Sequence, residues 1–191
     1  MRIIFIGPPG VGKGTQSKRL LDYLGVPHLS TGDMLRQALS EKSEVGLLSQ
    51  EYMSSGKLVP DPIILEIVGQ RLAQDDCQNG CLLDGFPRTL AQAKALDEYL
   101  DERGMPLSGV LELKVDHDEV VRRLAGRGRA DDAPEIIRAR VENYARQTQP
   151  LLDYYRKRGQ LHEVDGTGTP DQVFDRIKAV LARVCPESRE G

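Results

Sequence analysis

A short apolar run followed at once by a glycine-rich segment constrains this chain more than any other feature. Ile3–Ile6 has the four consecutive apolar residues of a buried strand, and "GPPGVGKGT" follows it from Gly7 to Thr15. The spacing G-x-x-x-x-G-K, which ends at Lys13, is typical of loops that surround phosphate groups between a strand and a helix. Glycines let backbone N–H groups turn toward an anion, and the helix start adds partial positive charge. We therefore expect a phosphate-binding strand–loop–helix unit; the alternative is a glycine-rich turn without a ligand.

The rest of the chain repeats the alternation of strand and helix. Further strands are expected at His28–Leu29, Cys81–Leu83, Val110–Val115 and Leu161–Val164. Between them apolar residues recur at helical spacing, as at Ile64, Val68 and Leu72. A proline follows both Asp61 and Thr169, which we interpret as helix-capping residues. Repeated strand–helix–strand order predicts an α/β fold with a parallel sheet and helices on both faces.

Two regions interrupt this alternation. The stretch from Ser30 to about Pro60 has helical character but no strand run, and "GRGRADDAP", from Gly126 to Pro134, is short, charged and rich in glycine. Excursions of this kind carry lids and binding loops. The expected divisions of a single domain are a core of 1–29, 60–125 and 135–191, an insertion at 30–59 and a short lid at 126–134.

The balance of charges argues against a nucleic-acid or membrane partner. The net charge is −3 in 191 residues, so no overall field attracts anionic polymers or lipids. The basic residues are nevertheless uneven, with 18 Arg and 8 Lys. Arginine forms forked hydrogen bonds to phosphate, so this bias suits a protein that handles phosphate esters, although solvated helix faces would also account for it.

The same sequence favours the cytoplasm. No stretch approaches the roughly 20 apolar residues of a membrane span, and the N-terminus lacks a signal-peptide pattern. Cys77, Cys81 and Cys185 are an odd number of cysteines with no further soft ligands nearby, which favours reduced thiols over a disulfide framework or a metal site.

One position departs from the general phosphate-loop motif. The residue after Lys13 is Gly14, where many nucleotide hydrolases have the Ser or Thr that binds Mg²⁺, and Thr15 comes one position later. This departure disfavours GTPases and motor ATPases, which use that hydroxyl.

Three motifs in order carry a resemblance to a known family. With "GPPGVGKGT", "STGDMLR" and "LLDGFPRT", the chain resembles the adenylate kinase family of nucleoside monophosphate kinases, from Met1 to about Val184. The resemblance implies a P-loop NTPase-type core, a small helical domain that binds the nucleoside monophosphate, and a mobile lid. It implies a monomer that catalyses MgATP + AMP ⇌ MgADP + ADP, with Mg²⁺ as cofactor and ATP, AMP and ADP as partners.

The resemblance also implies a role for individual residues. Those at ATP would be Gly10, Val11, Gly12, Lys13, Gly14, Thr15, Arg127 and Gly168. Those at AMP would be Thr31, Arg36, Lys57, Leu58, Val59, Gly85, Phe86, Pro87, Arg88, Gln92, Arg129 and Arg140. Those that act in catalysis would be Lys13, Asp84, Arg88, Arg123, Arg129 and Arg140.

Several of these positions also have a physical reason. Asp84 stands at the carboxyl end of a predicted strand, the edge where α/β sheets bind ligands, so its carboxylate could hold Mg²⁺ directly or through water; a strand-end cap is the alternative. Gln92 lies four residues beyond Arg88, on the same helix face, where the family reads adenine. Ser30 and Asp33 fit a helix capping box, which can coexist with binding.

The predicted lid is short. In the long form of the family about 25–30 residues are inserted between Gly128 and Arg129, sometimes with a four-ligand zinc site. This chain has no such insertion, so we expect the short-lid form and no structural zinc; Asp131 and Asp132 match an acidic pair of the lid.

Two other functions remain open on the sequence alone. A UMP/CMP kinase would share the fold, the loop and the arginines. A non-catalytic nucleotide-binding module would share the loop but would not need the six arginines between Arg122 and Arg140, which suit a second phosphate site.

Overall fold

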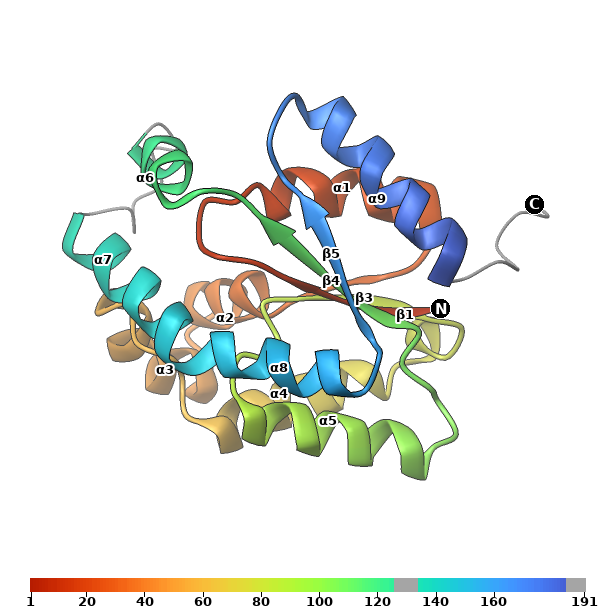
Figure 1. Cartoon of the computed structure of the whole chain (residues 1–191). Helices are drawn as coiled ribbons and strands as arrows, with labels where there is room; N and C mark the ends of the chain where they lie inside the picture. Colours follow the sequence, from red (N-terminus) through yellow and green to blue (C-terminus); the bar gives the residue numbers. More distant parts are fainter. Residues whose placement is uncertain (126–133, 185–191) are drawn as a thin grey trace.

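A single parallel sheet organises the fold (Figure 1). The computed structural model describes residues 1–125 and 134–184. Its strands follow the spatial order β2-β3-β1-β4-β5, with every neighbouring pair parallel. Their bounds are β1 (Arg2–Ile6), β2 (His28–Ser30), β3 (Cys81–Asp84), β4 (Gly109–Lys114) and β5 (Leu161–Asp165). The predicted strands are therefore confirmed to within one residue at each end, and so is the α/β class.

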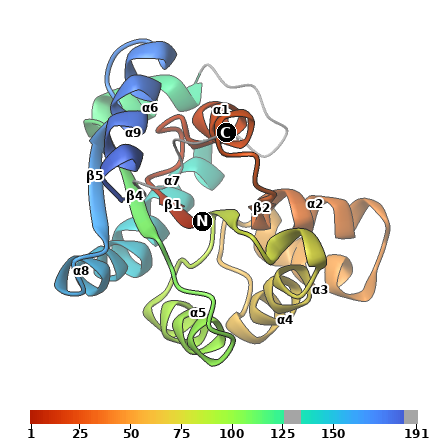
Figure 2. The same cartoon turned by 90° about the vertical axis from the view of Figure 1, so that its right-hand side faces the viewer.

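Helices cover both faces of the sheet. Figure 1 shows α1 and α9 on one face and α4, α5 and α8 on the other. The helices are α1 (Lys13–Leu24), α2 (Thr31–Ser40), α3 (Glu44–Ser54), α4 (Asp61–Leu72), α5 (Leu90–Glu102), α6 (His117–Ala125), α7 (Pro134–Asn143), α8 (Gln149–Lys157) and α9 (Pro170–Val184). A 3₁₀ turn spans Asp75–Cys77, and a π-helical turn at Tyr144–Thr148 joins α7 to α8. Helices α2 and α3 pack together beside β2 (Figure 2).

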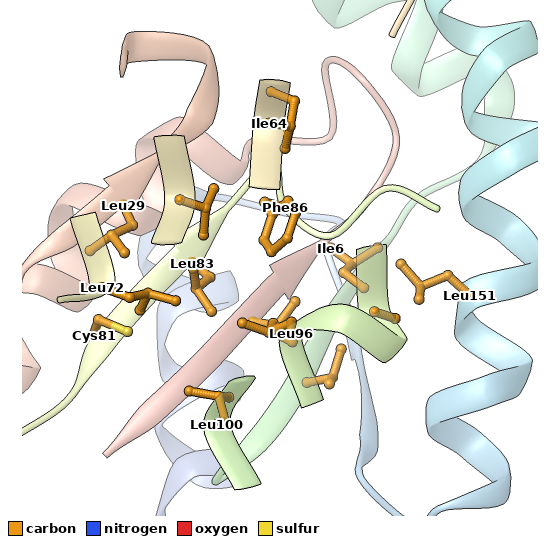
Figure 3. Packing of buried hydrophobic residues seen from close by; sticks show 14 of the residues in the cluster. Ile6, Leu29, Ile64, Leu72, Cys81, Leu83, Phe86, Leu96, Leu100 and Leu151 are labelled. Carbon is orange, nitrogen blue, oxygen red and sulfur yellow. The ribbon is translucent and has the colours of Figure 1, made fainter. Parts of the chain in front are cut away.

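The core has two layers because residues alternate between the two faces of each strand. In β1, Ile4 and Ile6 belong to the cluster beneath α4, α5 and α8, whereas Ile3 and Phe5 belong to the cluster beneath α1 and α9. Figure 3 shows the first of these clusters, with Leu83 at its centre. Helix and sheet thus bury continuous apolar surface on both sides of the strands, which leaves the strand ends available for a site.

Two of the three cysteines are buried in the first cluster. Cys77 and Cys81 are free thiols, and neither side chain is exposed to solvent. Burial raises the pKa of the Cys81 thiol to about 12, so the thiol stays protonated at physiological pH. The prediction of reduced thiols holds for these two residues, and the structure adds that both are buried; Cys185 lies outside the described residues.

The helix starts confirm some capping predictions and correct one. Ser30 Oγ accepts a hydrogen bond from the Asp33 N–H at 3.3 Å, and Thr169 Oγ1 accepts one from the Gln172 N–H, also at 3.3 Å. The prediction that Asp61 caps its helix is wrong, because α4 begins at Asp61 itself. Pro60 occupies the cap position, and the Asp61 carboxylate turns away toward α5.

Within residues 1–125 and 134–184, none of the helices combines the length and apolar character needed to cross a membrane.

A close approach between α2 and α3 holds the insertion together. Gly46, in α3, is buried against the backbone of Ala38, in α2: a Cβ at Gly46 would lie 2.2 Å from the Ala38 carbonyl carbon and oxygen. Real Cβ atoms do not come that near, so the two helices can pack in this way only with glycine at this position. Because α2 also carries Thr31 and Arg36, this contact positions two predicted site residues.

We expect Gly46→Ala to push α2 and α3 apart and to lower the free energy of unfolding by about 1–3 kcal/mol, the usual range for overpacking. Urea unfolding monitored by circular dichroism measures it. Gly69→Ala in α4 is the matched control, because a Cβ there meets no atom within 4 Å and alanine favours a helix by up to about 1 kcal/mol. Equal midpoints for the two variants would contradict the close approach.

Candidate active site

A cleft of about 1160 Å³ runs along the carboxyl ends of the strands. It is lined by the loop after β1, by α2, by the return segment 56–59, by the turn after β3 and by the loop before α9. Sites for one small ligand usually measure ~300–1,000 Å³. The cleft is therefore large enough for two substrates, one toward the loop after β1 and one toward α2.

The glycine-rich loop leads into α1 as the motif predicts. Gly12 precedes the helix in a left-handed conformation, with φ 107°, which residues with a Cβ rarely adopt. Lys13 starts the helix, and its Nζ donates hydrogen bonds to the carbonyl oxygens of Gly7 at 2.5 Å and Pro8 at 3.1 Å. The ammonium thus lies over its own loop beside the positive end of α1, where an anion would be stabilised.

Asp84 ends β3 at the floor of the cleft, with its side chain only 13% exposed. Its Oδ2 accepts a hydrogen bond from Ser17 Oγ at 3.2 Å and lies 3.4 Å from His28 Nε2. Burial acts to raise the pKa of this carboxyl, but the contacts to His28 and Ser17 and the charge of Lys13 hold the pKa below its usual value. Asp84 is therefore an ionised carboxylate at neutral pH, a hard oxygen donor of the kind that Mg²⁺ prefers.

Three arginines face the opposite part of the cleft. Arg36, Arg88 and Arg140 all line it, and Arg88 Nε donates to the Gly85 carbonyl at 2.7 Å, which holds the guanidinium against the turn after β3. Partial dehydration lowers the pKa of Arg88, and the charges of Arg140 and Arg36 lower it further, while Asp84 acts in the opposite direction. Arg36 is paired with Asp33 Oδ1 at 2.5 Å, and Asp33 also lines the cleft. Because arginine stays protonated, the three guanidinium groups still outnumber this carboxylate and favour an anionic group.

Arg123 joins three segments around the loop. Its Nη1 donates to the Val11 carbonyl at 2.8 Å, its Nη2 to the Gly166 carbonyl at 3.1 Å, and its Nε to Glu119 at 2.6 Å. The sequence predicts this arginine at a phosphate; in the structure its guanidinium also fixes α6 against the phosphate loop and the loop before α9. Glu119 is a site residue that the sequence analysis missed, although its i, i+4 spacing to Arg123 was a possible signal.

Gln92 lies in the first turn of α5 and is only 2% exposed, yet it lines the cleft. Its Oε1 accepts a hydrogen bond from the Arg88 N–H at 2.7 Å, and its Nε2 donates to Asp61 Oδ1 at 2.6 Å. The sequence places Gln92 on the same face as Arg88, and the structure adds that both ends of its amide are held by protein. Nothing in the sequence pattern pointed to the contact with Asp61.

One predicted AMP residue does not face the cleft. The side chain of Phe86 is 1% exposed and packs among the apolar side chains of the first cluster (Figure 3). A ring of this size gains more from burial against the sheet than from the wall of a polar cleft. Its contribution at the site is therefore to anchor the turn that carries Arg88.

The other predicted residues fall into two groups. Arg127 and Arg129, with the acidic pair Asp131 and Asp132, lie outside the described residues. The rest line the cleft: Gly10, Val11, Gly12, Lys13, Gly14, Thr15, Thr31, Arg36, Lys57, Leu58, Val59, Asp84, Gly85, Pro87, Arg88, Gln92, Arg123, Arg140 and Gly168.

The last residue of α7 and the π-helical turn that follows it supply two supports to which no sequence pattern pointed. Thr148 Oγ1 donates to the Arg88 carbonyl at 3.0 Å, and Asn143 Nδ2 donates to the Gly56 carbonyl at 2.9 Å. Both contacts join residues 60 or more positions apart, so no local motif announces them. They attach the arginine turn and the return segment of the insertion to the same helical unit.

The role of the Arg123 hydrogen bonds can be tested by substitution, with the neighbouring Arg122 as the control. Arg123→Lys cannot reach both carbonyls, so we expect a loss of about 1–2 kcal/mol in the free energy of unfolding and about tenfold weaker use of a nucleoside triphosphate. Arg122→Lys should change neither, because the Arg122 side chain is 74% exposed and a lysine can keep its surface ion pair with Glu119. Urea unfolding and triphosphate KM measure the two effects; identical behaviour of the variants would contradict this role.

Comparison with known proteins agrees with this geometry. The family model described as adenylate kinase matches residues 5–160. An adenylate kinase of Clavibacter michiganensis subsp. michiganensis is 49% identical, over 100% of this chain and 98% of its own length. An adenylate kinase of Mycobacterium sp. (strain MCS) is 46% identical over 183 aligned positions, and one of Thermodesulfovibrio yellowstonii is 43% identical over 214, each covering 96% of this chain and all of the relative. With this similarity along nearly its whole length, the chain belongs to the adenylate kinase family.

Proposed function

We propose that this protein is an adenylate kinase, which transfers a phosphoryl group reversibly from MgATP to AMP and so balances the cell's adenine nucleotides. The observation that carries this function is that one cleft contains both the phosphate loop with Lys13 and a second cationic region formed by Arg36, Arg88 and Arg140. A module that only binds one nucleotide needs the first region and not the second. The membership of the family supports the same reaction.

The chemistry requires positioning and charge stabilisation more than proton transfer. The loop amides, Lys13 and the start of α1 hold the phosphates of ATP. Arg123 keeps the loop and its neighbours in place and faces the same phosphates, while Arg88, Arg140 and, from the lid, Arg129 stabilise charge on the transferring group. These donors are arranged before the substrates meet, which is the condition for effective electrostatic catalysis.

The acid at the floor of the cleft fits a magnesium ion. An ionised, partly buried carboxylate at Asp84, beside the hydroxyl of Ser17, matches the one or two oxygen ligands with which proteins usually hold Mg²⁺ against a phosphate substrate. Asp84 would hold the ion directly or through water. When bound, Mg²⁺ neutralises charge on the phosphate oxygens of ATP.

We further propose that the insertion 30–59 and the lid 126–134 close over the bound substrates. The insertion 30–59 would cover AMP through Thr31, Arg36 and the segment Lys57–Val59, and the lid 126–134 would cover ATP through Arg127. Exclusion of water by both would protect ATP from hydrolysis. The alignment with the Thermodesulfovibrio relative has 214 positions, more than the 191 residues of this chain, so that relative has residues that this chain lacks, as a longer lid would require. A structural zinc is not expected in this form.

The proposed function also implies the ligands, the oligomeric state and the cellular compartment of the protein. ATP, AMP and ADP are the ligands, and no nucleic acid or membrane takes part. Every residue that we assign to the two nucleotides belongs to this one chain, so a monomer would be sufficient for activity. The cytoplasm, where these nucleotides and reduced thiols coexist, is the expected compartment.

Removal of the central arginine tests the reaction. We expect Arg88→Ala to lower kcat by roughly 10²–10³, as for removal of one preorganised donor, with an unchanged circular dichroism spectrum. Arg103→Ala, at the end of α5, is the control, because Arg103 stacks on Tyr99 away from the cleft. A coupled assay with ATP and AMP gives the rates, and Arg88→Ala within about threefold of wild type would remove Arg88 from the mechanism.

A panel of acceptors separates adenylate kinase from UMP/CMP kinase. We expect AMP to be preferred over UMP by about ten- to a hundredfold in kcat/KM, because an amide that reads adenine is left unpaired by uracil at a loss of ~1–3 kcal/mol. CMP should be the better of the two poor substrates, since cytosine has an amino group where uracil has a carbonyl. The same assay measures all three. Equal use of UMP or CMP would replace the adenylate assignment with the pyrimidine one.

A further inference from the structure

We propose that Asp61 is a positioning residue that fixes the orientation of the Gln92 amide and thereby makes the cleft select adenine over a 6-oxopurine. This inference rests on the proposed function, since it assumes that AMP is the acceptor read by Gln92. Asp61 does not line the main cleft and would not touch the nucleotide. Its effect would pass entirely through Gln92.

The Asp61 carboxylate is placed for this purpose by its helix. It begins α4, directly after the return segment from the insertion, and its side chain makes no capping bond of its own helix. Instead Oδ1 accepts from Gln92 Nε2 at 2.6 Å, and Oδ2 lies 3.3 Å from Thr89 Oγ1, which donates to it. Thr89 in turn caps α5 by accepting from the Gln92 N–H at 3.1 Å. Asp61 and Thr89 therefore hold Gln92 by both its backbone and its side chain.

The two partners of the amide allow only one orientation. An ionised carboxylate can only accept a hydrogen bond, and a backbone N–H can only donate one. Gln92 must therefore present its NH₂ group to Asp61 and its oxygen to the Arg88 N–H, as observed. In the reversed orientation, Gln92 Oε1 would face the Asp61 carboxylate and the Gln92 NH₂ group would face the Arg88 N–H, so both buried hydrogen bonds would be lost. Such a loss of two hydrogen bonds opposes rotation of the amide.

The hydrogen-bonding groups of Gln92 that the protein leaves unused determine which base the amide can pair with. A glutamine amide has two N–H donors and two oxygen lone pairs, and the protein uses one of each. One donor and one acceptor are left, in positions that the protein has fixed. Adenine has an amino donor at C6 and an acceptor at N1, whereas hypoxanthine has a carbonyl acceptor at C6 and an N–H donor at N1. A fixed amide that pairs with the first is mismatched to the second, although the two bases have nearly the same shape.

An amide that could turn over would accept both bases. Asp61→Asn is nearly isosteric but can donate as well as accept, so it removes the restraint at one end while the Arg88 N–H remains at the other. We expect this variant to narrow the ratio of kcat/KM for AMP to that for IMP about five- to tenfold. The KM for AMP should rise several-fold, whereas kcat and the KM for ATP should stay within about twofold, because the phosphate contacts are untouched.

Two further variants separate positioning from stability. Asp61→Glu keeps an acceptor-only group and should retain the AMP-to-IMP ratio to within about threefold. Glu44→Gln removes an exposed acid from the first turn of α3, away from the cleft, and controls for loss of charge at a helix start. Urea midpoints for all four proteins show whether an effect follows unfolding; a merely structural role would change the midpoint and leave the base ratio unchanged.

The assay is a coupled measurement of turnover with AMP, IMP and ATP for wild type and the three variants. A ratio that falls in Asp61→Asn and is restored in Asp61→Glu supports the inference. An unchanged ratio in Asp61→Asn, or a wild type that uses IMP as well as AMP, overturns it and leaves the adenylate kinase reaction standing. A wild type that does not phosphorylate AMP overturns the proposed function itself, and the inference with it.

Discussion

The parallel pairing of β1 with β3 is the constraint on which the rest of the site depends. In this register Phe5 lies opposite Asp84, so the strand that leads into the glycine-rich loop ends beside the strand that carries the acid. Side chains from both strands are buried on both faces, and a slip of one residue would exchange the two core clusters. The hydrophobic effect that fixes the register therefore also fixes the point at which the glycine-rich loop begins relative to the Asp84 carboxylate.

The parallel sheet and the site residues that directly follow its strands can be predicted from the sequence. Short apolar runs at Ile3–Ile6 and Cys81–Leu83 predicted strands because strands buried on both faces are continuously apolar. The loop after β1 has the glycine and lysine spacing that is typical of a phosphate loop. The resemblance to the family then supplied positions such as Arg36 and Gln92, which composition and periodicity alone would have left as surface or core residues.

The parts that could not be predicted are contacts between distant segments. Asp61 was interpreted as a helix cap because Asp followed by Pro is the local signal for one; its actual partner is 31 positions away and becomes visible only when α4 and α5 lie side by side. Phe86 likewise carries no sign that its ring turns into the core. Local patterns record what a residue does for its own helix, whereas the pairing of side chains depends on tertiary packing, which overrides them.

The buried cysteines have a consequence for chemical durability. Thiol oxidation proceeds through the thiolate, and a pKa of about 12 leaves only on the order of one Cys81 side chain in 10⁵ in that form at pH 7. Cys77 is also fully buried, with its pKa raised by burial. Arg71 Nη1 lies 3.0 Å from Cys77 Sγ and favours the thiolate, but burial outweighs it. The two sulfur atoms serve the first core cluster as packing groups, and we expect that cluster to respond little to the surrounding redox potential.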